Sequence, residues 1–429
     1  MRHGCQLYPL SRRGGVAATL IVPILDRAAG GLAILDHLMS SPSAIRAVEP
    51  IVVALPRDTP YLGPLGPGEE VNERGYFVRR GNRTIYPTVD RSVLVKITAA
   101  DGTIGWGETY GIIAPEAVVA LLRDVMIPIV LQRTTDDPAA IYAELYDLMR
   151  VRGGSGGFYG DGLAAIDIAL WDLKARRAGV PLAHALGGAR TARIAAYVSG
   201  LPAATLSERV ALAQSWRARG YRGIKYAAVV SREGVAAEMH ALRAALGADA
   251  DLMVDLHWQY SADEALELAR NLAPAKPYFI EAPCAPEDIR GLARVAAEAG
   301  VPVAAGEEWR NEHEANMRLD HARLAYVQPE MAHTGVSQFC AIARRAAKDG
   351  SGVIPHATIG VGIFLAASLA AASTLPDCPY HEYQHSVFDR HLPFVDTTMR
   401  CANGYYDVAA GPGHGVIPRP ALWNHIVPM

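Results

Sequence analysis

Three short apolar runs decide the fold of this chain, 251-DLMVDLHW-258, 278-YFIEAP-283 and 301-VPVAAGEE-308. Each run has the length and apolar content of a buried strand, and a stretch with helical periodicity follows each of them. Each also carries an acidic residue near its end, namely Asp255, Glu281 and Glu307, and both intervals between these residues are 26 positions. Repeated units of one strand and one helix are typical of a parallel sheet, and this many of them are typical of a barrel.

The same alternation continues on both sides of these runs. Further strand-like runs occupy residues 194–200, 223–229, 324–330 and 351–358, with helical stretches between them. We therefore expect an α/β protein whose barrel spans residues 161–380. Residues 381–429 are rich in Gly and Pro, and we expect them to return to the first domain.

The part before the barrel has strands first and helices second. Residues 47–55 have the β-branched content of a strand, and the segment 91-RSVLVKITAADGTIGWGET-109 is typical of a hairpin with its turn at Asp101 and Gly102. Helical periodicity follows in 115–131 and in 138–149. This order predicts an α+β domain over residues 47–160.

A glycine-rich stretch, residues 153–162, separates the two parts and reads as a loop. An amphipathic helix is expected next, over residues 163–178, ending at Gly179.

Residues 1–46 differ from the rest of the chain. Arg12 and Arg13 precede an apolar stretch that is too short to span a bilayer and lacks a clear cleavage site, so an export signal fits poorly. We expect this segment to be a disordered extension or the product of a misplaced start codon, with Met39 as a possible true start.

The bulk composition excludes several classes of function. The 429 residues carry a formal net charge of −3, which gives no basic excess for binding nucleic acid. The five cysteines are scattered and lack metal-ligand spacing, so a disulfide framework or a zinc site is not expected. We expect a cytoplasmic homo-oligomer that acts on a small molecule and binds neither nucleic acid nor membrane.

The three acidic residues predict a metal site. Barrel enzymes place their chemistry at the C-terminal ends of the strands, so Asp255, Glu281 and Glu307 converge at the barrel mouth. One such residue alone would be an ordinary rim carboxylate, but three together repel one another unless a hard cation neutralises them, and Mg²⁺ is the usual choice. Glu308 has the opposite strand parity, so we expect it beside the site or in contact with substrate, although an exchange of roles with Glu307 stays open.

The next strand ends continue the series with Glu330, His356 and Glu382. A lone histidine is more often structural, but His356 falls in phase with the carboxylates. Glu330 on the neighbouring strand could accept from one imidazole nitrogen and so fix the tautomer that a general base needs.

Four earlier strand-end residues complete the candidate site. Lys225 could neutralise a substrate carboxylate, and Tyr226 next to it points the other way by strand alternation. His257 lies two residues beyond Asp255 and so should share its face. Ser199, at the end of the first barrel strand, could contact a substrate oxygen.

Together these residues resemble the enolase superfamily, and in particular its mandelate racemase-like group, over roughly residues 47–415. The resemblance rests on GTIGWGET in the first domain, on the helix AAIDIALWDLKARRAGVPLAHALGG, and on the strand-end order Lys225, Asp255, Glu281, Glu307, Glu330, His356 and Glu382. It implies a (β/α)7β barrel beneath an α+β capping domain. It also implies Mg²⁺, abstraction of the proton α to a carboxylate, and an enediolate intermediate.

Two departures from the family pattern bear on the reaction. The second lysine of the family's K-x-K strand is Ala227, which removes the usual second base of a racemase. His257 gives D-x-H after the metal aspartate, which is similar to acid-sugar dehydratases, where that histidine protonates the departing hydroxyl. A smaller departure is that Glu330 stands where the family usually has aspartate beside the catalytic histidine.

We therefore expect a dehydratase of an aldonic or aldaric acid that yields a 2-keto-3-deoxy acid. His356 is the expected base, His257 the expected acid, and Glu382 a partner for the substrate carboxylate. An epimerase, racemase or lactone cycloisomerase is the alternative, and a catalytically silent member of the family is a third.

In this family the capping loops, here residues 57–77 and 108–113, contact the distal end of the substrate. Their polar and basic content suits a hydroxylated substrate that could carry a second carboxylate. The candidate contacts in these loops are Tyr61, Asn72, Arg74, Tyr76, Arg79, Arg80, Thr109 and Tyr110, and those near strand ends are Trp258, Arg310 and His333.

Overall fold

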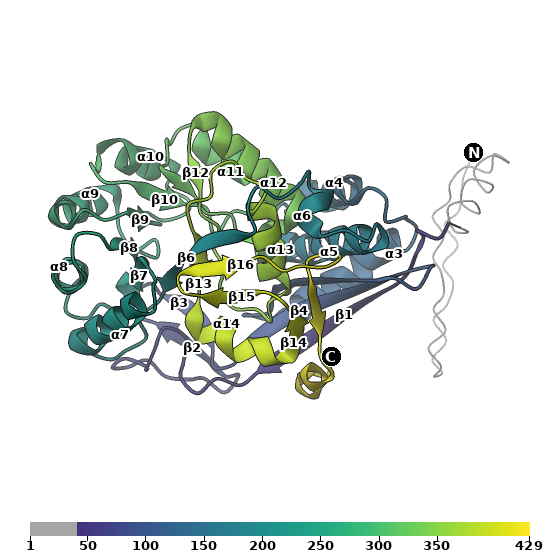
Figure 1. Cartoon of the computed structure of the whole chain (residues 1–429), viewed down its shortest axis with the longest axis horizontal. Coiled ribbons are helices and arrows are strands. Elements are labelled where there is room, and N and C mark those ends of the chain that lie inside the picture. The colour runs from purple at the N-terminus through teal and green to yellow at the C-terminus, as the bar shows by residue number, and fades with distance from the viewer. Residues whose placement is uncertain (1–40) are drawn as a thin grey trace, which may run out of the picture.

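A computed structural model describes residues 41–429 of the chain (Figure 1). The expected extension over residues 1–46, including a start at Met39, lies almost wholly outside the described residues. Within residues 41–429, no helix combines the length and the apolar content that crossing a bilayer requires.

The first domain is built on a three-stranded antiparallel sheet in the order β1-β4-β5. Its strands are β1 (Ile45–Leu55), β4 (Asp90–Ala99) and β5 (Ile104–Tyr110), and a separate hairpin consists of β2 (Tyr76–Arg79) and β3 (Thr84–Pro87). The helices are α2 (Pro115–Leu121), a π-helical turn (Leu122–Met126), α3 (Ile127–Val130), α4 (Pro138–Met149) and a short turn (Arg150–Arg152). The expected strand, hairpin and two helical stretches are confirmed.

The helix that joins the two domains differs from the expectation. Helix α5 runs over Gly157–Arg177, so it takes in half of the glycine-rich stretch that was expected to be a loop. It is also buried on nearly every side rather than amphipathic. The glycines of β5 explain this burial, because a Cβ atom at Gly105 or Gly107 would lie 2.3 Å or 1.8 Å from backbone oxygens of α5.

The barrel has eight parallel strands, β6 to β13, with a helix after each of the first seven. The strands are β6 (Arg193–Ser199), β7 (Gly223–Ala227), β8 (Asp251–Asp255), β9 (Phe279–Glu281), β10 (Val303–Ala305), β11 (Tyr326–Val327), β12 (Gly352–Val353) and β13 (His381–Tyr383). The helices are α7 (Leu206–Ala218), α8 (Val235–Leu246), α9 (Ala262–Leu272), α10 (Ile289–Glu298), α11 (Glu312–Leu319), α12 (Met331–Asp349) and α13 (Ile363–Ala372). The (β/α)7β barrel is therefore confirmed.

Neighbouring barrel strands are paired in chain order, and β13 pairs in parallel with β6. The ring closes between β12 and β13, where the Glu382 amide donates to the Pro355 carbonyl at 3.3 Å. The eighth strand thus lies just beyond the expected domain boundary at residue 380. Figure 1 shows the helices surrounding the barrel and the capping sheet beside it.

The C-terminal segment lies against both parts of the molecule. Its elements are α14 (His385–His391), β14 (Val395–Thr397), β15 (Arg400–Ala402), β16 (Tyr405–Asp407), β17 (Val416–Pro418) and the short helices Leu392–Phe394 and Pro420–His425. Three further short helices, α6 (Leu182–Ala185), Ala228–Val230 and Ala273–Ala275, lie earlier in the chain. Strand β16 pairs with the start of β6, and the Val427 amide donates to the Val52 carbonyl on β1 at 2.9 Å.

Glu108 on β5 connects the capping sheet to the barrel. Its buried carboxylate accepts from the backbone amides of Val361, Ile363 and Phe364 at 2.5, 2.9 and 3.1 Å. These amides belong to the loop after β12 and to the start of α13. The loop that follows His356 is therefore held by a side chain of the other domain.

Candidate active site

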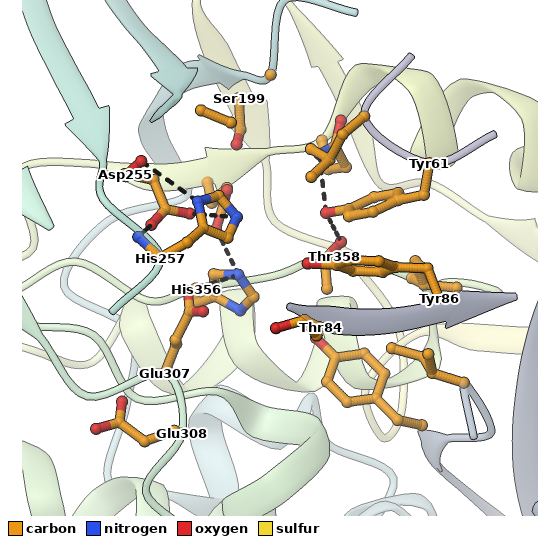
Figure 2. Close-up of a pocket in the computed structure, with 18 of the residues that line it drawn as sticks. Tyr61, Thr84, Tyr86, Ser199, Asp255, His257, Glu307, Glu308, His356 and Thr358 are labelled. Carbon is orange, nitrogen blue, oxygen red and sulfur yellow. Dashed lines mark hydrogen bonds and ion pairs between the residues drawn. The ribbon is translucent and has the colours of Figure 1, made fainter. Parts of the chain in front are cut away.

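The three predicted metal ligands come together at the C-terminal end of the barrel. Asp255 and Glu281 are the last residues of β8 and β9 and are partners in the sheet register, and Glu307 follows β10 by two residues. One carboxylate oxygen of each lies within 4.8 Å of the others. Figure 2 shows Asp255 and Glu307 facing the same space as His257 and His356.

This carboxylate cluster fits a hard divalent cation. Asp255 and Glu281 are buried, and Glu281 Oε1 has no hydrogen-bond partner among residues 41–429. Burial raises the pKa of both groups. Three close carboxylates, one with an unpaired buried oxygen, form the oxygen donor set that Mg²⁺ prefers.

Lys225 on β7 lies beside this cluster. Its Nζ atom is 2.6 Å from Glu281 Oε2 and 3.2 Å from Glu382 Oε1. Burial alone would lower the pKa of Lys225, but these two carboxylates outweigh it and raise that pKa well above its ordinary value. Lys225 is therefore a fixed positive charge at the mouth of the barrel.

His356 occupies the position expected of a general base. Its Nδ1 atom lies 2.7 Å from Glu330 Oε2, and its Nε2 atom lies 3.0 Å from Glu307 Oε2 and 3.5 Å from Glu382 Oε2. Burial opposes the charged imidazolium, but Glu307 and Glu382 outweigh burial and raise the pKa of His356. A cation held by the carboxylates would offset that negative charge and so favour the neutral, basic imidazole.

Glu330 contacts His356 and has two further hydrogen-bond partners, Tyr110 and Ala332. Its Oε2 atom also accepts a hydrogen bond from the Tyr110 hydroxyl at 2.6 Å, and its Oε1 atom accepts from the Ala332 amide at 2.9 Å. The extra methylene of glutamate therefore does not prevent a carboxylate–histidine dyad. Tyr110 was expected to contact substrate, but its hydroxyl is directed to this dyad.

His257 reaches the cavity by a different route from the one expected. Strand β8 ends at Asp255, and His257 and Trp258 both have left-handed backbones, with φ of 49° and 55°. The turn brings His257 Nε2 to 3.1 Å from Asp255 Oδ2, and the His257 amide donates to Asp255 Oδ1 at 2.8 Å. His257 therefore lies next to Asp255 because of this turn and not because of strand alternation.

Most of these groups line one cavity of about 370 Å³, while Glu281 and Glu330 are buried behind its wall. Its barrel wall includes Ser199, Lys225, Asp255, His257, Glu307, His356 and Glu382. A single space thus adjoins the carboxylate cluster, the lysine and both histidines.

The other predicted substrate contacts are placed less uniformly. Glu308 lines the cavity, its Oε1 accepts from Trp309 Nε1 at 2.9 Å, and burial raises its pKa to about 7. Tyr226 also borders the cavity, but its hydroxyl donates to the Val235 carbonyl at 2.7 Å. Arg74 is exposed and lies outside the cavity wall.

The capping side of the cavity is not the basic surface that the sequence predicts. It consists of Tyr61, Leu62, Thr84, Ile85, Tyr86, Tyr110, Ile112, Ile113, Phe158 and Asp161. The guanidinium of Arg79 instead turns inward, where it donates to the carbonyls of Tyr61, Gly63 and Pro64 and pairs with Glu69 at 2.8 Å. Arg79 therefore shapes the loop that carries Tyr61 and Leu62 and does not face the substrate.

Sequence reasoning missed several residues of the wall. Thr358 Oγ1 lies 2.6 Å from the Tyr61 hydroxyl, which also accepts from Gln384 Nε2 at 3.3 Å. Thr358 and Gln384 each lie two residues beyond a predicted site residue, so the same offset could have identified them. Asp161 was missed because its segment was assigned to a loop, yet it borders the cavity and pairs with His333 at 2.7 Å.

Comparisons with known proteins agree with this geometry. Residues 84–187 match the N-terminal domain of mandelate racemase and muconate lactonizing enzyme, and residues 208–422 match the enolase C-terminal domain-like family.

Two characterised relatives and one solved structure are similar along most of the chain. D-galactarolactone cycloisomerase of Agrobacterium fabrum is 31% identical over 350 residues, which are 78% of this chain and 91% of that protein. D-galactonate dehydratase of Cronobacter sakazakii is 30% identical over 355 residues, which are 78% of this chain and 90% of that protein. A crystal structure of an enolase-superfamily member from Agrobacterium tumefaciens is 49% identical, with a TM-score of 0.88, and the match covers 90% of this chain and 100% of that chain.

The family matches, the long alignments and the shared barrel with its strand-end carboxylates lead to one assignment: the chain belongs to the enolase superfamily, in the mandelate racemase and muconate lactonizing enzyme group.

Proposed function

We propose that the protein is a Mg²⁺-dependent dehydratase of an acid sugar, which removes the proton α to the carboxylate, eliminates the β-hydroxyl and yields a 2-keto-3-deoxy acid. The observation that carries this proposal is the placement of His257 and His356 on one cavity beside the carboxylate cluster. A β-elimination needs one group that accepts a proton and one that donates a proton, and the two imidazoles offer both.

Asp255, Glu281 and Glu307 are the residues that would hold the cation. When bound, Mg²⁺ supplies positive charge that stabilises the negative charge developing on the substrate carboxylate. Lys225 adds a second positive charge to the same region, because its Nζ atom lies within 3.2 Å of both Glu281 and Glu382.

The first proton transfer falls to His356. Glu330 accepts from Nδ1, which leaves Nε2 as the nitrogen that faces the cavity and takes the α-proton. The assignment of hydrogen to Nδ1 follows from its 2.7 Å contact with a carboxylate oxygen, which can only accept. Glu382 contacts both Lys225 and His356 and so fixes their positions at the carboxylate end of the substrate.

The second transfer falls to His257. Its proton goes to the departing β-hydroxyl, which leaves as water as the Cα–Cβ double bond forms. The enol product then takes up a proton and becomes the 2-keto-3-deoxy acid, so the net change is the loss of one water molecule. Ala227, where a second lysine base would stand in a racemase, favours this course over two-base racemisation.

A second candidate is a lactone cycloisomerase. The observation in its favour is the D-galactarolactone cycloisomerase of Agrobacterium fabrum, which is 31% identical to this chain. The same α-proton abstraction would serve that reaction, but the group that leaves would be a ring oxygen, which stays attached to the product. The two reactions therefore differ in whether water is released.

The test is a screen of aldonic and aldaric acids and their lactones with Mg²⁺ in deuterated water, followed by NMR. The dehydratase predicts a 2-keto-3-deoxy acid and the loss of the β-hydroxyl. Ring opening with an unchanged number of atoms would support the cycloisomerase instead. Deuterium at Cα with inversion of its configuration and no loss of water would indicate an epimerase, and an absence of product and exchange across the panel would overturn the proposal.

A further inference from the structure

Within residues 41–429, the capping side of the cavity wall carries no positive charge, and its one charged residue is Asp161 on α5, which pairs with His333. Five of its ten lining residues are aliphatic or phenylalanine side chains, namely Leu62, Ile85, Ile112, Ile113 and Phe158. The barrel adds Trp258 and Ile359 to this apolar part of the wall.

The polar atoms of the capping side are already bonded to protein. The Tyr86 hydroxyl accepts from Asn82 at 3.0 Å, and the Thr84 hydroxyl donates to the Asn82 carbonyl at 3.3 Å. The Tyr61 hydroxyl is bonded to Thr358, and that of Tyr110 to Glu330. A ligand that reaches this wall therefore meets five apolar side chains, and of the four hydroxyls that of Tyr86 keeps its own proton free to donate.

Two of these apolar side chains are unusually exposed. Ile85 is 38% exposed and Phe158 is 42% exposed, although each borders the cavity. Exposed apolar side chains around a cavity typically mark surface that a ligand covers.

Among residues 41–429, one arginine borders the cavity, and it is partly engaged. Arg310 Nη1 donates to the Glu308 carbonyl at 2.7 Å, and its Nε atom lies 3.5 Å from Asp161 without a hydrogen-bond partner. Asp161 and Glu308 also place two acidic groups beside this guanidinium. A carboxylate at the far end of a substrate would therefore meet two acidic groups around the one guanidinium that residues 41–429 place on this part of the wall.

The orientation of the substrate follows from the positions of the reacting groups. The carboxylate and α-carbon must lie at Lys225, His356 and the carboxylate cluster. Figure 2 shows Tyr61, Thr84 and Tyr86 on the side of the cavity away from Asp255, His257 and Glu307. The end remote from the carboxylate therefore points to the apolar capping wall.

We infer that the preferred substrate is a monocarboxylic acid whose distal end is uncharged and apolar, such as an acid sugar that ends in a methyl group, and that Leu62, Ile112 and Ile113 select it. This inference rests on the proposed function for the reaction at the carboxylate end. It narrows the substrate from acid sugars in general to those that lack a second carboxylate.

The experiment compares three acids of one configuration that differ at C6, namely the 6-deoxyhexonate, the hexonate and the hexarate. The expected order of kcat/KM is methyl above hydroxymethyl by about 10-fold and above carboxylate by at least about 100-fold, because apolar burial favours the methyl group and desolvation penalises the charge. Equal or better turnover of the hexarate would overturn the inference while leaving the dehydratase intact.

A variant provides the reciprocal test. Ile113→Arg places a positive charge on the wall and should raise kcat/KM for the hexarate and lower it for the 6-deoxy acid. Val78→Arg is the matched control, because Val78 is an exposed apolar residue of the same domain that lies outside the cavity wall. A change of preference in the control, or none in Ile113→Arg, would count against the apolar wall as the selector.

A second measurement tests the apolar distal end even if the proposed dehydration fails. If none of the three acids loses water, their binding is ranked by the rise in thermal unfolding temperature with Mg²⁺ present. Tightest binding of the 6-deoxy acid would then support the apolar distal end although the reaction is another one. Tightest binding of the hexarate would overturn the inference as well.

Discussion

Tyr110 and His356 both contact the same carboxylate oxygen, Glu330 Oε2. The Tyr110 hydroxyl lies 2.6 Å from Glu330 Oε2, and His356 Nδ1 lies 2.7 Å from the same atom. Tyr110 belongs to the capping sheet, whereas Glu330 and His356 follow β11 and β12 of the barrel. The base of the proposed reaction is therefore positioned by both domains.

This relationship predicts the behaviour of Tyr110→Phe. The variant keeps the ring, which packs edge-on against His333 and Phe364, and loses only the hydrogen bond. A hydrogen bond to a charged group contributes about 1.5–3 kcal/mol, so kcat should fall about 10-fold or more while KM changes little. The rate of deuterium exchange at Cα should fall by the same factor.

Tyr146→Phe serves as the control, because this partly buried tyrosine lies in the same domain and outside the cavity wall. A rise in KM with unchanged exchange in Tyr110→Phe would show that the hydroxyl contacts substrate, as the sequence alone suggested.

Loss of one carboxylate from the cluster should abolish both metal binding and activity. In Glu281→Gln we expect activity to fall at least about 1,000-fold, because the buried donor set is incomplete. Calorimetry should show Mg²⁺ raising the unfolding temperature of the wild type by a few degrees and not that of the variant. Glu287→Gln alters a nearby exposed glutamate and should behave as the wild type. Full activity after exhaustive chelation would contradict the metal assignment.

Substitution of the two histidines should separate the two proton transfers. His356→Asn should lose both dehydration and α-proton exchange. His257→Asn should lose dehydration by about 100-fold or more and retain exchange, since general acid catalysis contributes factors of this size. NMR in deuterated water measures both quantities in one sample. The opposite pattern would make His257 the base.

A buried histidine away from the cavity predicts how stability depends on pH. Burial lowers the pKa of His381 to about 4, and its ring nitrogens contact Ser368 and the Glu382 carbonyl. Between the unfolded value of about 6.5 and the folded value, the unfolded chain binds a proton that the folded chain does not. The stabilisation is therefore complete above about pH 6.5 and is lost as the pH falls toward 4, by about 3 kcal/mol at most.

The corresponding variant is His381→Gln, which cannot titrate. It should unfold at a lower temperature than the wild type at pH 7. The difference between the two unfolding temperatures should become smaller as the pH approaches 4.5. His321→Gln, at an exposed position, should leave the pH dependence of unfolding unchanged. A gap that stays constant with pH would show that His381 does not titrate in this window.

The clustering of the three carboxylates could be predicted from the sequence because it follows from local, repeated geometry. One strand and one helix form each unit, so carboxylates 26 residues apart reach the same barrel edge. His257 was correctly expected near Asp255, but for the wrong reason. The strand stops at Asp255, and two left-handed residues make the turn, which strand periodicity does not reveal.

The contacts between the domains could not be predicted in this way. Tyr110 and Glu330 are 220 positions apart, and no periodicity connects residues on separate folding units. Arg79 was wrongly predicted to contact substrate for a similar reason. A basic residue near a loop is expected to be exposed, and the sequence does not reveal the carbonyl groups that its guanidinium contacts. Helix α5 was misjudged because it includes Gly157, Gly160 and Gly162, residues of a type that usually breaks helices, whereas the glycines that allow its close packing lie on β5.

Glu108 carries a consequence for how such proteins can diversify. Its carboxylate accepts from three amides in the loop that follows His356 and at the start of α13. The two domains are therefore hydrogen-bonded to each other next to the proposed base. A chimera could take residues 84–187 from one relative and the barrel from another. It should acquire the substrate preference of the first relative only if Glu108 and its three amide contacts are kept. Recombination between lineages should therefore tolerate exchange at Leu62 or Ile113 far better than exchange at Glu108. The capping domain can then vary in the side chains of the cavity wall, while the residue that attaches it to the barrel stays the same.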